Sequence, residues 1–252
     1  MKFTKMQGLG NDFVVVEGPT PIDSEQVARW CERRTGVGAD GVLEVSRVDF
    51  GRVRMRYWNA DGSPSEMCGN GLRCVALYAV DHHLVSGPDL LIDTAVGTLS
   101  AQVRADGSVR VEVGKAHPHR VDSLTVAGQT VHPVGFGNPH AVLYVDDVET
   151  APVGELGPRI GRDPLFPEGA NVEFMHVVDE NVIDLRVWER GVGETLACGS
   201  GAAAAAFIAT RDGHTKNSVT VQLRGGPLGV EIIDDVAWLD GPAETVFTGD
   251  VT

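Results

Sequence analysis

The sequence has no hydrophobic run long enough to cross a membrane. Its longest apolar run, residues 202–209, falls far short of the ~18 residues that a membrane-spanning helix needs. Positive charge is also scarce: 21 Lys and Arg stand against 35 Asp and Glu, which gives a formal net charge of −14. This balance argues against nucleic acids and anionic membranes as partners. We therefore expect a small-molecule ligand and, because no secretory signal is visible near Met1, a cytoplasmic protein.

Cysteine is rare as well, and its spacing does not match common metal sites. The four cysteines form no CxxC pair, and the sequence contains no HExxH motif, so we expect no metal. A reducing compartment would argue against structural disulfides. Thiol chemistry at one or two positions remains the main interpretation, while Cys31 and Cys74 are interpreted as small buried hydrophobic residues.

Short segments rich in Val, Ile and Leu recur between Gly, Asp-Gly and Pro residues, which is typical of strands and hairpins. Asp106-Gly107 is the clearest hairpin turn, because this dipeptide tolerates the positive φ angles of a type I′ turn. Ser24 is the expected N-cap of one helix. The apolar runs that follow Cys68 and Cys198 predict two buried helices.

The sequence also contains an internal repeat. One constant shift superposes several residues of the two halves without a gap, namely Arg56 and Arg186, Trp58 and Trp188, Cys68 and Cys198, Gly69 and Gly199, and Gly71 and Gly201. Nearby shifts place Asn11 on Asn138 and Asp40 on Asn171. The chain is therefore expected to consist of two halves with one plan, which meet near residues 114–122.

Each half places a Cys-Gly-x-Gly turn before a predicted helix. A helix N-terminus has unpaired backbone N–H groups and the positive end of the helix dipole, which stabilise a thiolate and lower the pKa of the thiol. Related halves tend to present equivalent residues to a shared cleft. Cys68 and Cys198 would then remove an α-proton from one face of a substrate and return a proton to the other. Such a reaction inverts a stereocentre and requires no cofactor.

Six segments carry a resemblance to a known family, namely KMQGLGNDFVV, RRTGVGADGVL, YWNADGSPSEMCGNGLRC, FGNPHAV, GANVEFM and VWERGVGETLACGSGAAA. Together they resemble the diaminopimelate epimerases, within the cofactor-independent epimerases and racemases that include proline racemase. The resemblance covers nearly the whole chain. It implies an α/β (α+β) fold of two pseudo-symmetric domains, each a β-barrel-like sheet around a central helix, with the active site in the cleft between them. The expected domains are residues 1–116 with about 243–252, and residues 117–242, in a homodimer.

The resemblance implies epimerisation of LL-2,6-diaminopimelate to meso-diaminopimelate, in the synthesis of lysine and peptidoglycan precursors. No pyridoxal phosphate, metal or other cofactor is expected. Cys68 and Cys198 would be the acid/base pair, and His140 and Glu189 would tune the two thiols.

The same resemblance implies a set of substrate-binding positions at the two helix starts and near the distal amino-acid group. These are Gly69, Asn70, Gly199 and Ser200 for the reacting carboxylate, Asn11 and Asn138 beside it, Asn59, Asn171 and Arg190 for the distal group, and Glu189 for an ammonium. Gly41 departs from the family pattern, because many members have a glutamine there that contacts the substrate.

Three alternatives remain open at this point. The first is a racemase of another amino acid, of the histidine or proline type, on the same scaffold; the Glu189-Arg190 pair argues against the proline type. The second is an isomerase of this fold that lacks the cysteine pair, against which Cys68 and Cys198 argue. The third is a non-catalytic thiol or metal-binding protein, which metal analysis would reveal.

Overall fold

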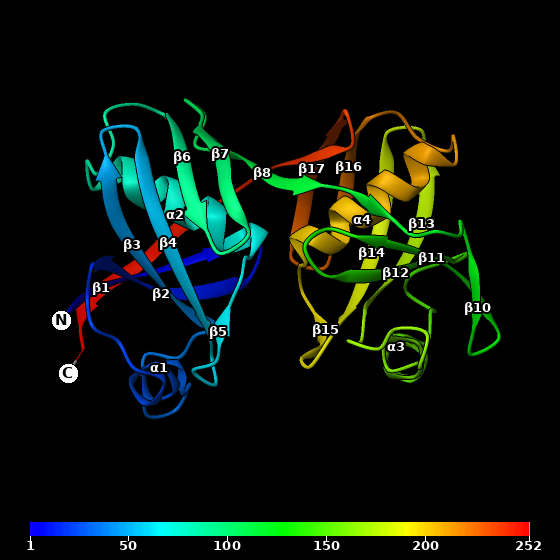
Figure 1. Cartoon of the computed structure of the whole chain (residues 1–252), viewed down its shortest axis with the longest axis horizontal. Helices are drawn as coiled ribbons and strands as arrows, with labels where there is room; N and C mark the ends of the chain where they lie inside the picture. The colour runs from blue at the N-terminus through cyan, green and yellow to red at the C-terminus, as the bar shows by residue number, and fades with distance from the viewer. Residues whose placement is uncertain (252) are drawn as a thin grey trace. The chain divides into compact units, whose positions relative to one another are not determined.

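The chain divides into two compact units, and the computed structural model describes residues 1–251 (Figure 1). The first unit comprises Met1–Val111 together with the C-terminal segment from Gly241, and the second comprises Glu112–Asp240. Each unit combines strands with one central and one outer helix. The expected mixed α/β class with two similar halves is confirmed.

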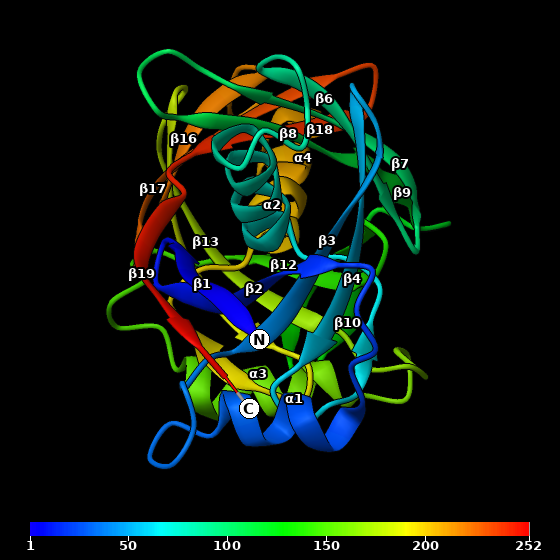
Figure 2. The ribbon, with the colours of Figure 1, turned by 90° about the vertical axis from the view of Figure 1, so that its left-hand side faces the viewer.

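The first unit surrounds helix α2 (Gly69–Asp81) with strands. These are β1 (Lys2–Gly8), β2 (Asn11–Gly18), β3 (Gly41–Asp49), β4 (Arg52–Asn59), β5 (Pro64–Ser65), β6 (Asp89–Thr94), β7 (Gly97–Val103) and β19 (Glu244–Asp250). The order β19, β1, β2, β3, β4, β6, β7 contains two parallel pairings, β2 with β3 and β4 with β6. Figure 2 turns this unit toward the viewer and shows α2 beside β1, β2 and β3, all of which it contacts.

Strand β8 (Val109–Lys115) leads into the second unit, whose central helix is α4 (Gly199–Arg211). The strands are β9 (His117–Pro118), β10 (Leu124–Val126), β11 (Gln129–Gly135), β12 (Pro139–Tyr144), β13 (Asn171–Asp179), β14 (Val182–Glu189), β15 (Gly193–Thr195), β16 (Ser218–Leu223), β17 (Gly226–Ile233) and β18 (Val236–Gly241). The first unit's pattern recurs, because β12 with β13 and β14 with β16 are the parallel pairs. Helix α4 contacts β11 to β14, β16 and β17 (Figure 1).

The central helices are buried on nearly all sides, which distinguishes them from amphipathic surface helices. In α2 the buried residues extend from Gly69 to Ala79. In α4, five consecutive alanines, residues 202–206, are all fully buried. Alanine combines the highest helix propensity with a side chain small enough to let strands approach closely. The two apolar runs therefore form the buried helices that the sequence predicts.

Helix α1 (Ser24–Cys31) packs outside the first unit against β3 and β4, and α3 (Val153–Gly161) packs in the same way against β13 and β14. The N-cap of α1 is Asp23 rather than the expected Ser24. Asp23 accepts a hydrogen bond from the Gln26 backbone N–H, and the Gln26 side chain accepts one from Asp23. This reciprocal capping box satisfies two N–H groups, which is why the helix begins one residue after Asp23.

The hairpin at Asp106-Gly107 joins β7 to β8, as expected. Its turn is not of type I′, because Gly107 has a φ of +85° whereas Asp106 is not among the positive-φ residues. Instead the Arg104 N–H donates to the Ser108 carbonyl, and the Asp106 carboxylate accepts from Ser108. The Asp106 side chain therefore supports a longer loop with one left-handed residue.

The strand register refines the internal repeat. In the first unit Phe13 pairs with Gly41 across parallel strands, and in the second His140 pairs with Asn171. The register thus aligns Gly41 with Asn171, and the sequence alignment that placed Asp40 there is wrong by one residue. Similar residues in the two loops favoured an alignment shifted by one residue, whereas the hydrogen bonds between the strands define the correct alignment.

Candidate active site

Cys68 and Cys198 are the N-cap residues of α2 and α4, with extended backbones at φ −144° and −125°. Within the described residues, neither cysteine side chain makes a capping hydrogen bond to its own helix. The first-turn N–H groups are therefore left to other acceptors, as at helix starts that bind carboxylates or phosphates. Each unit thus holds one half-site built around a thiol at a helix start.

In the first half-site, the Asn11 side chain is hydrogen-bonded at both ends of its amide. The Cys68 thiol donates to Asn11 Oδ1 at 3.4 Å, and Asn70 Nδ2 donates to the same oxygen at 3.2 Å. On its other side, Asn11 Nδ2 donates to Asp40 Oδ2 at 2.7 Å. A carboxylate only accepts hydrogen bonds, so Asp40 fixes the amide with its carbonyl toward the thiol.

Arg73 lies behind this half-site and is fully buried. Its Nη2 donates to Asn70 Oδ1 at 2.8 Å, and its Nε donates to the Pro242 carbonyl at 3.1 Å. Because a guanidinium only donates, Asn70 must direct its amino group away from Arg73 and toward Asn11. The sequence analysis did not single out Arg73. The signal that could have identified it is a charged residue within an otherwise apolar helix, at a position where the repeat has Ala203 in the other unit.

In the second half-site Cys198 is buried, and its Sγ lies 3.6 Å from Ser200 Oγ. Burial raises the pKa of Cys198 well above its ordinary value, and the Glu189 carboxylate raises it further. The Ser200 hydroxyl and the nearby Gly201 backbone lower it by less. The expectation of a lowered thiol pKa is therefore wrong for Cys198, because desolvation outweighs the helix start.

Glu189 accepts a hydrogen bond from the Cys198 thiol. Its carboxyl is hydrogen-bonded by the Thr195 hydroxyl and by Cys198, while burial raises its pKa above the ordinary value. A carboxyl with a raised pKa beside a thiol with a raised pKa reduces the cost of moving a proton between them. Glu189 is thus placed to exchange a proton with Cys198.

Replacing Glu189 with glutamine is expected to speed alkylation of Cys198 at pH 8 by roughly 3- to 10-fold. The substitution removes a negative charge that raises the thiol pKa, so more thiolate forms at a given pH, about tenfold per pKa unit. Iodoacetamide labelling followed by mass spectrometry of the Cys198 peptide measures the rate. Thr195→Val, which keeps the charge, is the control, and a slower rate in Glu189→Gln would contradict the electrostatic explanation.

His140 connects two further polar residues of the second half-site. Its Nδ1 lies 2.7 Å from Glu173 Oε1, and its Nε2 lies 2.8 Å from Asn138 Oδ1. His140 and Glu173 are both buried. Glu173 was missed by sequence reasoning, since a single glutamate in an apolar strand gives no local signal of its partner.

Comparison with known proteins places the chain in a family. The family model described as diaminopimelate epimerase matches residues 3–118 and 133–252. The chain belongs to the diaminopimelate epimerase family. It is 42% identical to the diaminopimelate epimerase of Moorella thermoacetica, with 99% of each chain covered, and 43% identical to that of Stutzerimonas stutzeri, with 100% of this chain and 99% of the other covered.

Solved structures that are less similar in sequence share the fold of this epimerase family member. A PhzF-family phenazine biosynthesis protein of Bacillus anthracis matches with a TM-score of 0.76 at 17% identity, covering 100% of this chain and 99% of that one. A hydroxyproline epimerase of Agrobacterium vitis matches with a TM-score of 0.75 at 15% identity, covering 100% and 90%. Both chains support the two-domain α/β architecture.

The residues that the family resemblance assigns to the distal group have well-defined partners in this structure. Asn171 Oδ1 accepts the Arg190 backbone N–H at 2.8 Å, and Arg190 Nη1 donates to the Glu168 carbonyl at 2.7 Å. Asn59 Nδ2 donates to Ser63 Oγ at 3.0 Å within its own turn. Asn171 therefore orders the backbone of Arg190, while Asn59 stabilises the loop that follows β4.

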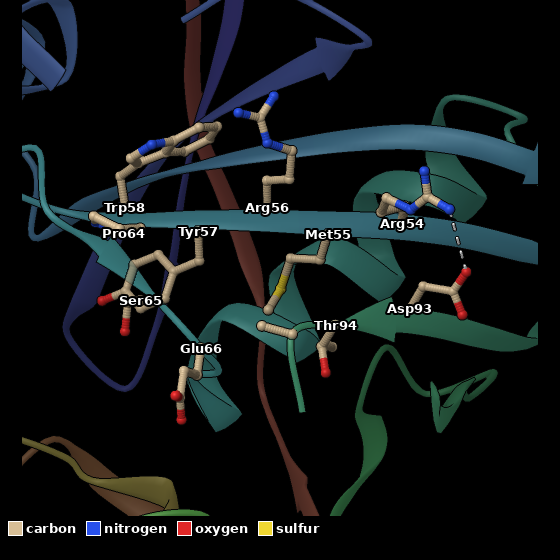
Figure 3. A pocket seen from close by; sticks show the side chains of 11 residues that line it. Arg54, Met55, Arg56, Tyr57, Trp58, Pro64, Ser65, Glu66, Asp93 and Thr94 are labelled. Carbon is tan, nitrogen blue, oxygen red and sulfur yellow. Dashed lines mark ion pairs between the residues drawn. The ribbon is translucent and has the colours of Figure 1, made fainter. Parts of the chain in front are cut away.

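Gly41, where the family resemblance implies a glutamine in many members, has no room for a side chain. A Cβ there would overlap the Trp58 carbonyl oxygen and lie 2.7 Å from the Tyr57 ring. Tyr57 also lines a cavity of about 340 Å³ (Figure 3), where it points with Met55 to the same side of β4. The Tyr57 ring thus covers position 41, which explains how the chain fills the space that a larger residue would occupy.

Burial disfavours the thiolate forms of the other two cysteines. Burial raises the pKa of Cys31 to about 11 and that of Cys74 to about 12. Within the described residues, none of the four cysteines forms a disulfide. In residues 1–251, no cluster of three His, Cys, Asp or Glu side chains could hold a metal ion, and no helix is long and apolar enough to span a bilayer.

Proposed function

We propose that this protein epimerises LL-2,6-diaminopimelate to meso-diaminopimelate by two-base proton transfer without a cofactor. The observation that carries the proposal is the matched pair of thiols, Cys68 and Cys198, each at the start of a buried helix in one of two related units. Membership of the diaminopimelate epimerase family supports this choice of substrate. The product would serve lysine and peptidoglycan precursor synthesis.

The helix starts stabilise negative charge on the reacting carboxylate. As the α-proton leaves, the carboxylate gains enolate character, and the first-turn N–H groups of Gly69, Asn70, Gly199 and Ser200 are the donors that such a charge requires. This stabilisation grows as the charge develops, so it lowers the barrier more than it strengthens ground-state binding.

In the proposed reaction, the two sulfurs carry all the protons that are moved. One sulfur, as thiolate, takes the α-proton and becomes a thiol; the other, as thiol, delivers its proton to the opposite face of the same carbon and becomes a thiolate. Glu189 accepts the Cys198 proton when that thiol must ionise. One turnover exchanges the protonation states of Cys68 and Cys198, and the reverse reaction restores them.

Arg190→Ala is expected to raise the KM for diaminopimelate by about 10- to 100-fold, the effect of losing a charged hydrogen bond to the distal carboxylate. Inhibition by alanine, which lacks a distal group, should change less than threefold. Steady-state kinetics with both ligands measures the difference. Arg162→Ala, which removes a charge outside the half-sites, is the control, and equal losses for the two ligands would contradict the assignment.

The test of the proposed function is incubation of the reduced protein with LL-diaminopimelate in D2O, with no added cofactor. Meso product that carries solvent deuterium at the inverted α-carbon supports the proposal. Absence of exchange would refute it and would favour the histidine or proline racemase alternatives, which the same assay tests with those amino acids.

We further propose that the protein acts in the cytoplasm as a homodimer and that β19 contributes to the interface. Strand β19 pairs with β1 and carries two exposed apolar residues, Val246 and Phe247, of which Phe247 packs edge-on against Phe3. Exposed apolar side chains side by side are typical of subunit contacts.

Val246→Asp is therefore expected to weaken the dimer at least tenfold, because it would bury an unpaired carboxylate at the contact. Light scattering coupled to size-exclusion chromatography at several protein concentrations measures the change. Leu165→Asp, a similarly exposed position in the second unit, is the control and should leave the oligomeric state unchanged. A monomeric wild type would contradict the dimer itself.

A further inference from the structure

Glu173 is a buried carboxyl that none of the steps above requires. It lies on β13, its side chain is fully buried, and Oε1 is 2.7 Å from His140 Nδ1. Its second oxygen, Oε2, has no hydrogen-bond partner among the described residues. Burial raises the pKa of Glu173, and His140 together with the backbone N–H groups of Ala141 and Glu173 opposes that rise only in part. An ionised carboxylate with one bare oxygen in this position would be strongly disfavoured, whereas a neutral acid is tolerated.

The first unit shows what the fold itself requires at these two positions. By the strand register, Phe13 stands where the second unit has His140, and Leu43 stands where it has Glu173. Both first-unit residues are fully buried and apolar. The same architecture is therefore completed by hydrocarbon in one unit and by an acid-imidazole pair in the other.

Contacts at the helix starts confirm that Leu43 and Glu173 are equivalent. A Cβ on Gly71 would lie 3.3 Å from Leu43 Cδ2, and a Cβ on Gly201 would lie 2.9 Å from Glu173 Oε1. Each residue therefore packs against the last glycine of its Cys-Gly-x-Gly turn. The polar pair in the second unit thus points to a role in the half-site rather than in the fold.

The protonation of Glu173 determines the arrangement of its neighbours. A neutral carboxyl donates its O–H to His140 Nδ1, which leaves the imidazole proton on Nε2 to donate to Asn138 Oδ1. The Nδ2 amino group of Asn138 is then the end left to donate to a ligand. An ionised Glu173 beside a neutral imidazole would instead hold the proton on Nδ1 and require the Asn138 amide to turn around.

The equivalent asparagine in the first unit is held the opposite way. Asn11 gives its amino group to Asp40 and presents its carbonyl to the Cys68 thiol. Asn138 gives its carbonyl to His140. One half-site therefore offers an acceptor to a thiol proton, whereas the other offers a donor suited to a carboxylate or enolate oxygen.

We propose that Glu173, in its neutral form, is a positioning residue that acts through His140 to hold the amino group of Asn138 toward the substrate carboxylate. This inference rests on the proposed function for the identity of that ligand. The orientation of the three side chains can be tested without any substrate.

The first arm of the experiment measures the His140 tautomer directly. Long-range 1H–15N NMR of the ligand-free wild type at pH 7 is expected to show His140 neutral with its proton on Nε2, and the signal is assigned by its loss in His140→Phe. A proton on Nδ1, or an imidazolium, overturns the proposal whether or not the protein turns over diaminopimelate. An inactive protein with the expected tautomer would refute the proposed function alone.

The second arm compares Glu173→Gln with Glu173→Leu. The glutamine amide donates to Nδ1 as the neutral acid does, so kcat should stay within about threefold of wild type and the tautomer should be kept. Leucine removes the donor, so kcat and kcat/KM should fall together by about 10- to 100-fold, the effect of one misplaced buried hydrogen bond. Equal losses in the two variants would overturn the proposal, because they would mean that the negative charge is what matters.

The internal repeat supplies a control for folding. The double variant His140→Phe with Glu173→Leu copies the pair found in the first unit and should keep its melting temperature while it loses activity as Glu173→Leu does. Wild-type activity in a folded double variant would overturn the proposal. If the double variant fails to fold, the wild-type tautomer measurement still decides.

Discussion

Replacing either Cys68 or Cys198 with alanine is expected to lower kcat/KM for diaminopimelate by at least about 10³-fold. A positioned acid or base contributes roughly 10² to 10⁴ in rate, and in the proposed mechanism each turnover requires both sulfurs, so the loss of one removes an entire proton transfer. Neither side chain caps its helix in the described structure, so both variants should stay folded. Chiral chromatography of the product and deuterium content at the α-carbon measure the loss.

Cys31→Ala is the matched control, because this thiol is buried, as that of Cys198 is, but lies outside both half-sites. Its kcat/KM should stay within about twofold of wild type, as a small cavity affects stability more than catalysis. If either Cys68→Ala or Cys198→Ala kept more than a tenth of the wild-type rate, the two-thiol mechanism would be wrong.

Gly62→Ala is expected to lower the free energy of unfolding by about 4 kcal/mol or more, which is exceptional for one methyl group. Gly62 has a φ of +83°, and a Cβ there would overlap the Ser24 carbonyl oxygen and lie 2.9 Å from Ser24 Cα. The turn that contains Gly62 begins at Asn59, because the Gly62 N–H donates to the Asn59 carbonyl at 2.9 Å. The substitution therefore forces this turn away from the first residue of α1.

Gly107→Ala separates the two causes of that loss. Gly107 has nearly the same φ, +85°, but a Cβ there would meet nothing within 4 Å. Gly107→Ala should therefore lower the free energy of unfolding only by the cost of the left-handed backbone conformation, about 1–2 kcal/mol. Urea denaturation of both variants gives the comparison. Equal losses would show that backbone conformation, and not the contact with Ser24, determines the stability of the Gly62 turn.

The parts of the site that the sequence predicts are those with local signals. Cys68 and Cys198 are predicted as site residues because each precedes Gly-x-Gly and an apolar run, and their positions at helix starts follow from these neighbouring residues alone. The mixed α/β fold with two similar halves followed from the repeat and the family resemblance. The N-cap of α1 differed by one residue, because Ser24 and Asp23 are both good capping residues and only the contact with Gln26 decides between them.

What the sequence could not predict depends on contacts between distant segments. The raised pKa of Cys198 results from burial and from the Glu189 carboxylate on β14, which together outweigh the effect of the helix start. Glu173 and His140 are brought together by the parallel pairing of β12 and β13. Arg73 reaches the Pro242 carbonyl near the other end of the chain. None of these long-range contacts produces a recognisable pattern in the local sequence.

At the uncapped starts of α2 and α4, helix stability and the proposed catalysis favour different residues at the same positions. Asp or Ser at an N-cap position would stabilise a helix by about 1 kcal/mol relative to a residue that does not cap. Selection for stability alone would therefore favour the replacement of Cys68 and Cys198, whereas the proposed catalytic role opposes it. A copy of this gene released from that selection is expected to lose its cysteines before it loses its fold.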